Sequence, residues 1–391
     1  MSTIRDVARA AGVSIATVSR VFNGASRVSD PARRRVEAAG RELDYWPNAA
    51  ARSLIGSRTR TLGVLLPDLY GEFFSDVIRG IDHAAAAADH QILIASSHAD
   101  VDEFLSAARS MRGRVDGLIA MTSDRDSAAA IAQITRYFSM VLINPRASVN
   151  GCNTVSVASL EGALSMVEHL LQLGHRRIAI IKGPRGNGDA EQRLRGYRKA
   201  LRGAGLKPDP ALEHAGDFTE ASGYRAALDL IQQKPGASAL FAANDYMAVG
   251  AMSALRDAGI KVPQEMAVTG FDDIAIAEYL SPPLTTVRVD AYELGVRAIE
   301  LWMNQPVDAK QSQHHVLSTA LVVRGSCGST RARAADTRER RQRRGRQARS
   351  AAPIDTDKGA VSEARDAIAP IAARRSRDAA GRISRSGRRQ P

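Results

Sequence analysis

A short predicted helix near the N-terminus presents side chains that can bind both the phosphates and the base edges of DNA. Its exposed face carries Ser14, Ile15, Ala16, Thr17, Ser19 and Arg20. Serine and threonine hydroxyls can donate hydrogen bonds to phosphate oxygens, and an arginine can donate two hydrogen bonds to a guanine edge. Ile15 and Ala16 can contact thymine methyl groups. These residue types on one helix predict a surface that reads double-stranded DNA.

Two further helices are predicted to position this surface. Thr3 followed by Asp6 is similar to a capping box, Gly12 ends the first helix, and Ser14 caps the second. Asp30 is predicted to be the N-cap of the third helix, with proline in its first position. The three helices are expected at residues 3–12, 15–23 and 30–43. A helix, a short turn and a second helix place that second helix in the major groove.

From residue 61 the pattern changes to alternating strands and helices. Strands are expected at residues 62–66, 91–95, 117–121, 140–143, 178–181, 239–242 and 266–270. Helices are expected at residues 73–88, 101–111, 128–136, 162–173, 193–204, 222–232 and 246–258. Such alternation predicts parallel sheets with helices on both faces. The pattern runs twice, the second time after Val155, and therefore predicts two doubly wound α/β lobes.

Charge is distributed unevenly along the 391 residues, whose net charge is +12. Residues 1–60 carry about +6, residues 61–327 about −5 and residues 328–391 about +11. Basic ends attract phosphate without reading a sequence. The last segment has too little apolar surface to fold and is expected to be disordered. Its basic charge either attracts DNA non-specifically or has no function.

Several classes of protein are disfavoured by the composition. There is no apolar run long enough for a transmembrane helix and no apolar signal segment, so we expect a cytoplasmic protein without a membrane partner. Cys152 and Cys327 are far apart, which favours reduced thiols. No GxGxxG, GK[ST], GxSxG or HExxH motif is present, so we expect no enzyme activity, no cofactor and no metal. The neighbouring His314 and His315 are expected on a late loop.

Read whole, the N-terminal segment closely resembles the DNA-binding head of the LacI/GalR family of bacterial regulators. Three motifs carry the resemblance in order: DVAxxAGVS, TVSRVxN and LxYxPNxxARSL. The resemblance implies that Ile15, Ala16 and Arg20 read base edges. It also implies a hinge helix over Asn48–Ile55 that binds the minor groove through Asn48, Ala51 and Leu54, with Leu54 as a wedge between base steps.

The resemblance continues to about Arg324 and implies a core similar to a periplasmic sugar-binding protein, with a ligand between the two lobes. The family's effector contacts match Arg193, Phe218, Asn244 and Asp272, while the first lobe offers Tyr70, Phe73, Phe74 and Asn144. Arginine, asparagine and aspartate suit ligand hydroxyls, and an aromatic ring covers a C–H face. Alternatives remain open: Arg193 as an interlobe salt bridge and Phe74 as plain core. Asp245 and Asp273 are expected to be structural, as helix caps. The glycine-rich segment 185–192 is longer than the family pattern and would suit a larger ligand such as a disaccharide.

The sequence therefore predicts a helix-turn-helix domain (1–46), a hinge and linker (47–60), a two-lobed effector-binding and dimerisation core (61–327) and a basic tail (328–391). We expect a homodimer, because one head reads only half of a palindromic operator. A small sugar or glycoside is expected to release this repressor of carbohydrate utilisation genes from its operator. The alternative is a purine-type co-repressor that tightens DNA binding. A transport receptor is disfavoured by the presence of the head.

Overall fold

The computed structural model describes residues 2–22, 28–46, 58–122, 127–146, 149, 151–305 and 312–328. The predicted hinge residues Asn48, Ala51 and Leu54 and almost all of the predicted basic tail lie outside these ranges. The division into four domains therefore stays a prediction. Among the described residues, no helix is long and apolar enough to cross a membrane.

The N-terminal unit consists of three helices around a small apolar core. These are α1 (Ile4–Ala11), α2 (Ile15–Phe22) and α3 (Asp30–Glu42). The predicted capping box is present, because the Thr3 backbone N–H donates to Asp6 and the Asp6 N–H donates to Thr3 Oγ1. The side chains of Val7, Val18 and Val36 are fully buried between the helices. One boundary prediction was wrong: Asp30 is the first residue of α3, and Ser29 is its N-cap.

The first lobe of the core is a six-stranded parallel sheet covered on both faces. The strand order is β11-β5-β4-β3-β1-β2. The bounds are β1 (Thr61–Leu66), β2 (Gln91–Ser96), β3 (Gly117–Met121), β4 (Ser139–Ile143), β5 (Asn153–Val157) and β11 (His314–Leu317). Helices α5 (Glu72–Ala87) and α13 (Ala291–Met303) pack on one face, and α6 (Val101–Met111) and α7 (Ser127–Ile134) pack on the other. Because both faces are covered, β1 is buried and free of polar side chains from Leu62 to Leu66.

The second lobe is built around a four-stranded parallel sheet of order β7-β6-β8-β9. Its strands are β6 (Ile178–Ile181), β7 (Glu213–His214), β8 (Ala239–Ala242) and β9 (Ala267–Thr269), and an antiparallel pair, β10 (Thr286–Arg288) and β12 (Ala320–Val322), lies beside it. Helices α8 (Ser159–Gln172) and α9 (Gly188–Gly203) cover one face; α10 (Glu220–Gln233) and α11 (Asp245–Asp257) cover the other. A 3₁₀ turn (Pro210–Leu212) and the short α12 (Ile276–Tyr279) complete the lobe.

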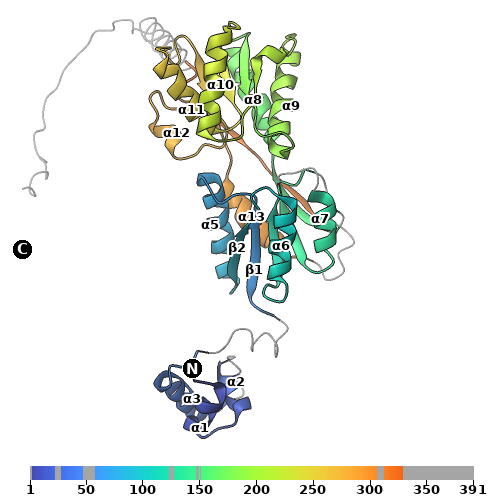
Figure 1. Ribbon diagram of the computed structural model, residues 1–391, viewed down its shortest axis with the longest axis vertical. Helices are drawn as coiled ribbons and strands as arrows, with labels where there is room; N and C mark the ends of the chain where they lie inside the picture. Colours follow the sequence, from blue (N-terminus) through green and yellow to red (C-terminus); the bar gives the residue numbers. More distant parts are fainter. Residues whose placement is uncertain are drawn as a thin grey trace, which may run out of the picture. The chain divides into compact units, whose positions relative to one another are not determined.

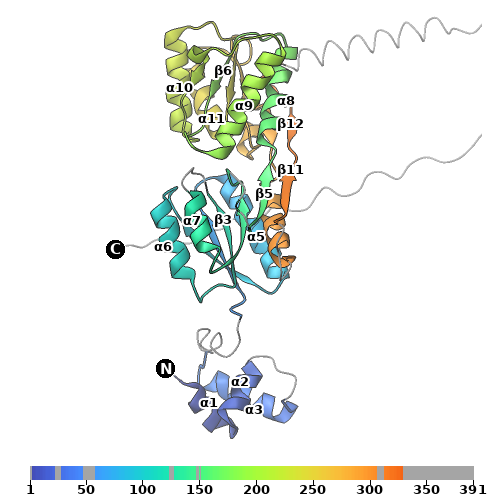
Figure 2. The same cartoon turned by 90° about the vertical axis from the view of Figure 1, so that its right-hand side faces the viewer.

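The two lobes are not successive halves of the chain, as the two runs of the sequence pattern suggested. After β10 the chain returns to the first lobe as α13 and β11, and it then crosses again to β12. Figure 2 shows β5 and β11 running side by side where they approach the second lobe. His314 and His315 lie in β11, so the prediction of a loop there was wrong. The sequence analysis assigned no element after residue 270 and so missed α13, although Asp290 caps this helix by accepting the Glu293 N–H.

Glycines allow α5 and α13 to approach each other unusually closely. A Cβ atom on Gly295 would lie 2.2 Å from the Val77 carbonyl oxygen, and one on Gly80 would lie 2.0 Å from that of Tyr292. Backbone therefore packs directly on backbone, which fixes the returning helix on the first lobe.

Candidate functional site

A cavity between the two lobes contains every effector residue predicted from the sequence. It is lined by Tyr70, Phe73, Phe74, Asn144, Arg193, Phe218, Asn244 and Asp272, together with residues that the sequence did not indicate. The lining residues follow the carboxyl ends of β1, β3, β4, β6, β7, β8 and β9, which is where open parallel sheets bind ligands. About 900 Å³ of empty space, partly open to solvent, lies within it.

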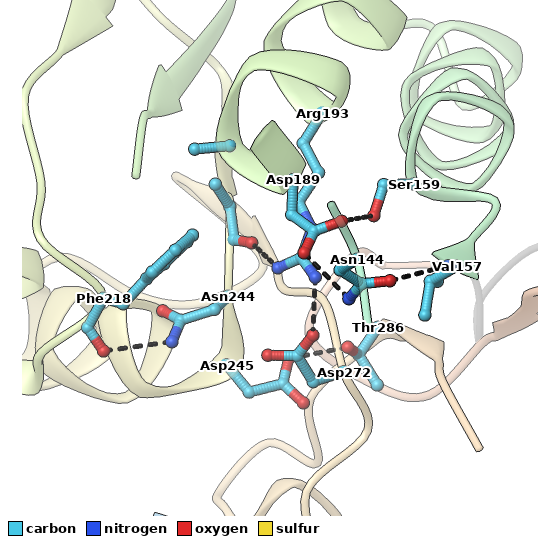
Figure 3. Close-up of polar contacts among 12 residues, drawn as sticks. Asn144, Val157, Ser159, Asp189, Arg193, Phe218, Asn244, Asp245, Asp272 and Thr286 are labelled. Atoms are coloured by element: carbon cyan, nitrogen blue, oxygen red, sulfur yellow. Dashed lines mark hydrogen bonds and ion pairs between the residues drawn. The ribbon is translucent and has the colours of Figure 1, made fainter. Parts of the chain in front are cut away.

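Arg193 lines the floor of this cavity and is held in place by three contacts, and Figure 3 shows its hydrogen bonds. Its guanidinium donates to the Ala243 carbonyl at 2.5 Å and to Asp272 Oδ1 at 3.0 Å, and it stacks 3.8 Å from the centre of the Phe271 ring. Arg193 and Asp272 belong to the same lobe, so the alternative of an interlobe salt bridge is wrong. Its buried Nε atom has no hydrogen-bond partner in the part of the chain that the structure describes.

A second carboxylate, Asp189, completes the polar floor and was missed by the sequence analysis. It accepts hydrogen bonds from Asn144 Nδ2 at 2.9 Å and from the Ser159 hydroxyl at 3.0 Å (Figure 3). Asn144 is in the first lobe and Asp189 in the second, so this contact joins the lobes. The available signal was the glycine-rich segment 185–192: the side chain of Asn187 caps α9, which begins five residues before its predicted start.

Burial controls the ionisation of the two carboxyl groups. Desolvation raises the pKa of Asp272 to about 6 despite the neighbouring Arg193 guanidinium. The negative charge of Asp189 contributes to this increase. Burial also raises the pKa of Asp189, against the charge of Arg193. Two carboxyl groups around one guanidinium carry a net negative charge when both are ionised, which a low-dielectric site disfavours.

The free energy of unfolding is expected to fall as the pH rises from about 4 to about 6. The pKa of Asp272 is 3.8 in the unfolded chain and about 6 in the folded one, so only the folded protein holds this proton in that window. The contribution is at most about 1.4 kcal/mol per pH unit for one proton. Urea unfolding across this range should show it. The Asp272→Asn variant should show a smaller decline, and parallel curves for the two proteins would contradict the assignment.

The two asparagines predicted as effector contacts are already engaged by the protein. Asn144 Oδ1 accepts the Val157 N–H at 2.9 Å. Asn244 Oδ1 caps α11 at the Met247 N–H, 3.0 Å away, while its Nδ2 donates to the Phe218 carbonyl. Their first role is therefore to hold the strand ends in place.

Aromatic rings line both sides of the cavity. Phe73 and Phe74 form an edge-to-face pair with ring centres 5.5 Å apart, and Tyr70 lies 6.1 Å from Tyr246, a residue of the second lobe that the sequence did not indicate. Phe74 lines the cavity and also packs against the core, so both of its predicted roles are compatible with the structure. Asn144, Phe218 and Asp272 have φ angles of 46°, 71° and 110°, a conformation that is uncommon outside glycine and concentrates at functional sites.

Asp245 and Asp273 are structural, although not as helix caps. Asp245 is fully buried and accepts from the Thr286 hydroxyl at 2.6 Å and from the Ile274 N–H at 3.0 Å. Burial raises its pKa well above the ordinary value. Asp273 forms ion pairs with two arginines, Arg288 and Arg324, both at 2.7 Å. These contacts fix the loop that carries Asp272.

The predicted DNA-reading residues lie together on α2. Ile15, Ala16 and Arg20 are exposed, whereas Val18 and Val21 are buried against α1 and α3. Ser14 Oγ accepts the Thr17 N–H at 3.1 Å, so it caps α2 as predicted. Ile15, Ala16 and Arg20 thus share the exposed face of α2.

The architecture and the cavity define a class of protein: a helix-turn-helix unit attached to a two-lobed ligand-binding core. Residues 3–48 match the model of bacterial regulatory proteins of the lacI family, and residues 167–327 match a periplasmic binding protein-like domain. The chain belongs to the lacI family of DNA-binding transcription regulators.

Known relatives match the chain along most of its length. The HTH-type transcriptional repressor CytR of Escherichia coli (strain K12) is 35% identical over 331 residues, covering 83% of this chain and 96% of that protein. The ribose operon repressor of the same strain is 35% identical over 329 residues, covering 83% of this chain and 100% of that protein. A Lac repressor dimer bound to operator and the anti-inducer ONPF superposes with a TM-score of 0.75 at 32% identity. The match covers 83% of this chain and 99% of that chain. These relatives are transcriptional repressors and not enzymes.

Proposed function

We propose that this protein represses carbohydrate utilisation genes by binding a pseudo-palindromic operator as a homodimer, and that a small sugar or glycoside releases it. The observation that carries the proposal is the cavity floor of Arg193, Asp189 and Asp272 between aromatic walls. The ribose operon repressor and the Lac repressor dimer, both similar over more than four-fifths of this chain, support repression by an operator-bound dimer.

The chemistry of the cavity suits a polyhydroxylated ligand. Arg193 Nε is a buried donor without a protein partner among the described residues, so a ligand oxygen is the acceptor that we expect. An unpaired buried donor costs about 1–3 kcal/mol, which a bound hydroxyl would recover. Asp272 offers carboxylate oxygens to the same ligand, and the ring of Phe218 can cover a C–H face.

The proposed contacts fall into two sets. The effector contacts are Tyr70, Phe73, Phe74, Asn144, Arg193, Phe218, Asn244 and Asp272. The operator contacts are Ser14, Ile15, Ala16, Thr17, Ser19 and Arg20 of the head and Asn48, Ala51 and Leu54 of the hinge.

The test needs an operator and a panel of ligands. The operator is obtained by selecting the full-length protein on randomised duplex DNA without ligand. Pentoses, hexoses, disaccharides, nucleosides and purines are then titrated into the complex while DNA anisotropy and the melting temperature of the protein are recorded. Release by a sugar that also raises the melting temperature is expected. Tighter binding of the protein to the operator in the presence of a purine would favour the co-repressor alternative instead. If the selection enriched no palindrome, the proposed pseudo-palindromic operator would be contradicted.

Replacing Leu54 with alanine is expected to weaken operator binding about 100-fold. The reason is the wedge role that the family resemblance gives this residue. Its insertion unstacks a base step at a cost of a few kcal/mol, and the bent duplex then makes additional contacts that more than offset this cost. Anisotropy titration of the selected operator measures the loss. The melting temperature and sugar affinity of the core serve as the control and should not change. Unaltered operator affinity would rule out the wedge.

A further inference from the structure

Four exposed arginines gather at one end of the first lobe. Arg109 is in the last turn of α6, Arg112 and Arg114 follow that helix, and Arg136 follows α7. We call these four residues the basic patch. All four lie between the end of a helix and the start of the next strand. Because β1, β3 and β4 are parallel, the amino ends of these strands lie at the same end of the sheet.

The basic patch adjoins the point where the chain from the DNA-binding head enters the core. β1, which begins at Thr61 (Figure 1), pairs with β3, whose first residue, Gly117, lies three positions after Arg114. Asp116, at this junction, accepts hydrogen bonds from the Thr59 N–H at 2.6 Å and the Arg60 N–H at 2.8 Å. These bonds fasten the incoming chain to the lobe beside the patch.

The charges of the basic patch are not neutralised by neighbours. Within the described ranges, none of its four arginines forms an ion pair. The nearby carboxylates are engaged elsewhere: Asp89 pairs with Arg60, and Asp116 binds the incoming backbone. The guanidinium of Arg112 lies 4.5 Å above the ring of Tyr137, whose exposed fraction is 60%. An arginine held over an exposed aromatic ring is a rigid, weakly hydrated cation, which suits binding to phosphate.

The core as a whole carries the opposite charge, and a second basic stretch lies in the other lobe at residues 176–207. Residues 61–327 carry about −5, so the core as a whole is repelled by DNA. A local positive surface on the end that continues into the head would reverse this repulsion there. Charges act over about 8 Å at physiological salt, so such a surface matters only for DNA brought close.

We propose that the basic patch binds backbone phosphates of the duplex that the head holds, adding a sequence-independent contact from the core itself. This inference rests on the proposed operator binding. Phosphate contacts strengthen binding to all sequences alike and increase its salt dependence.

The experiment compares the unsubstituted full-length protein with three full-length variants. The patch variant carries Arg109→Gln, Arg112→Gln and Arg114→Gln. The control variant carries Arg176→Gln, Arg202→Gln and Lys207→Gln, which remove the same charge from exposed positions of the second lobe. The dissociation constant is measured against salt for the selected operator and for an unrelated duplex. A third protein with lysine at the three patch positions keeps the charge.

The patch variant is expected to lower the slope of log K against log salt by about 2, which corresponds to the loss of one phosphate contact, about 0.9, from each of the two patches of a dimer. Its affinity should fall about 10-fold for both duplexes, with the lysine protein near the unsubstituted one. Equal losses in patch and control variants would indicate net charge alone, and no loss in either would also overturn the proposal. Failure of operator binding itself would appear separately, as no preference for the selected duplex in the unsubstituted protein.

Discussion

Replacing Arg193 with glutamine is expected to lower the affinity for the releasing sugar by about 30- to 3,000-fold, so that the operator complex no longer dissociates. The guanidinium binds Ala243 and Asp272 and is itself only 6% exposed. Truncating one partner of a buried charge pair costs about 2–5 kcal/mol, and every 1.4 kcal/mol is a factor of ten. Calorimetric titration of the sugar that responds most strongly in the panel measures this change.

The same substitution should lower the free energy of unfolding by about 3 kcal/mol, because Asp272 and Asp189 lose their cation. A matched control is Arg198→Gln in the same helix, whose ion pair with the buried Glu213 lies outside the cavity lining and leaves Lys182 beside that carboxylate. That variant should retain sugar response. If Arg193→Gln still released DNA at the original sugar concentration, the cavity floor would not be the effector site.

Replacing Arg20 with alanine is expected to weaken binding to the selected operator by about 30- to 10⁴-fold. One bidentate arginine–guanine contact contributes about 1–3 kcal/mol, and a dimer on a palindrome loses two of them. Arg20 is exposed on α2, so its removal leaves the apolar core of the head intact. Anisotropy titrations with the operator and with operators altered at single base pairs measure both affinity and specificity.

Arg9→Ala provides the matched control for this prediction. Arg9 is an exposed arginine of α1 that pairs with Asp6 in the same helix, and its loss removes the same charge. We expect it to change affinity by a few-fold, equally for all sequences. If Arg20→Ala weakened all duplexes equally too, the role of Arg20 would be phosphate binding, and base reading would be assigned elsewhere on α2.

Local sequence was sufficient for the elements that depend on local rules. The capping box at Thr3, the cap at Ser14 and the apolar strand at residues 62–66 were predicted because capping and burial patterns are written in neighbouring residues. Asn244 and Asp272 were also expected after strand ends, which meet at one edge of a parallel sheet, whereas Arg193 and Phe218 came from the family resemblance.

The roles of individual polar side chains were decided by the tertiary structure. Asn144 and Asp189 are 45 residues apart, and nothing in the sequence indicates that they bond across the two lobes. Arg193 and Asp272 were predicted to share a ligand, but their direct pairing depends on how α9 packs beside the end of β9. A hydrogen bond needs an approach of about 3 Å, and residue spacing along a chain does not specify distances between distant segments.

By itself, the sequence determined the class of this protein: a DNA-reading helix followed by two α/β lobes with polar side chains at their strand ends. Only the tertiary structure decided that α13 and β11 return to the first lobe, and that Asp189 and Tyr246 join the cavity. It also brought Arg109, Arg112, Arg114 and Arg136 together beside the incoming chain. The physical reason is that strand and helix periodicity reports which face of an element is buried, whereas the neighbour that buries it is chosen by packing across the whole fold.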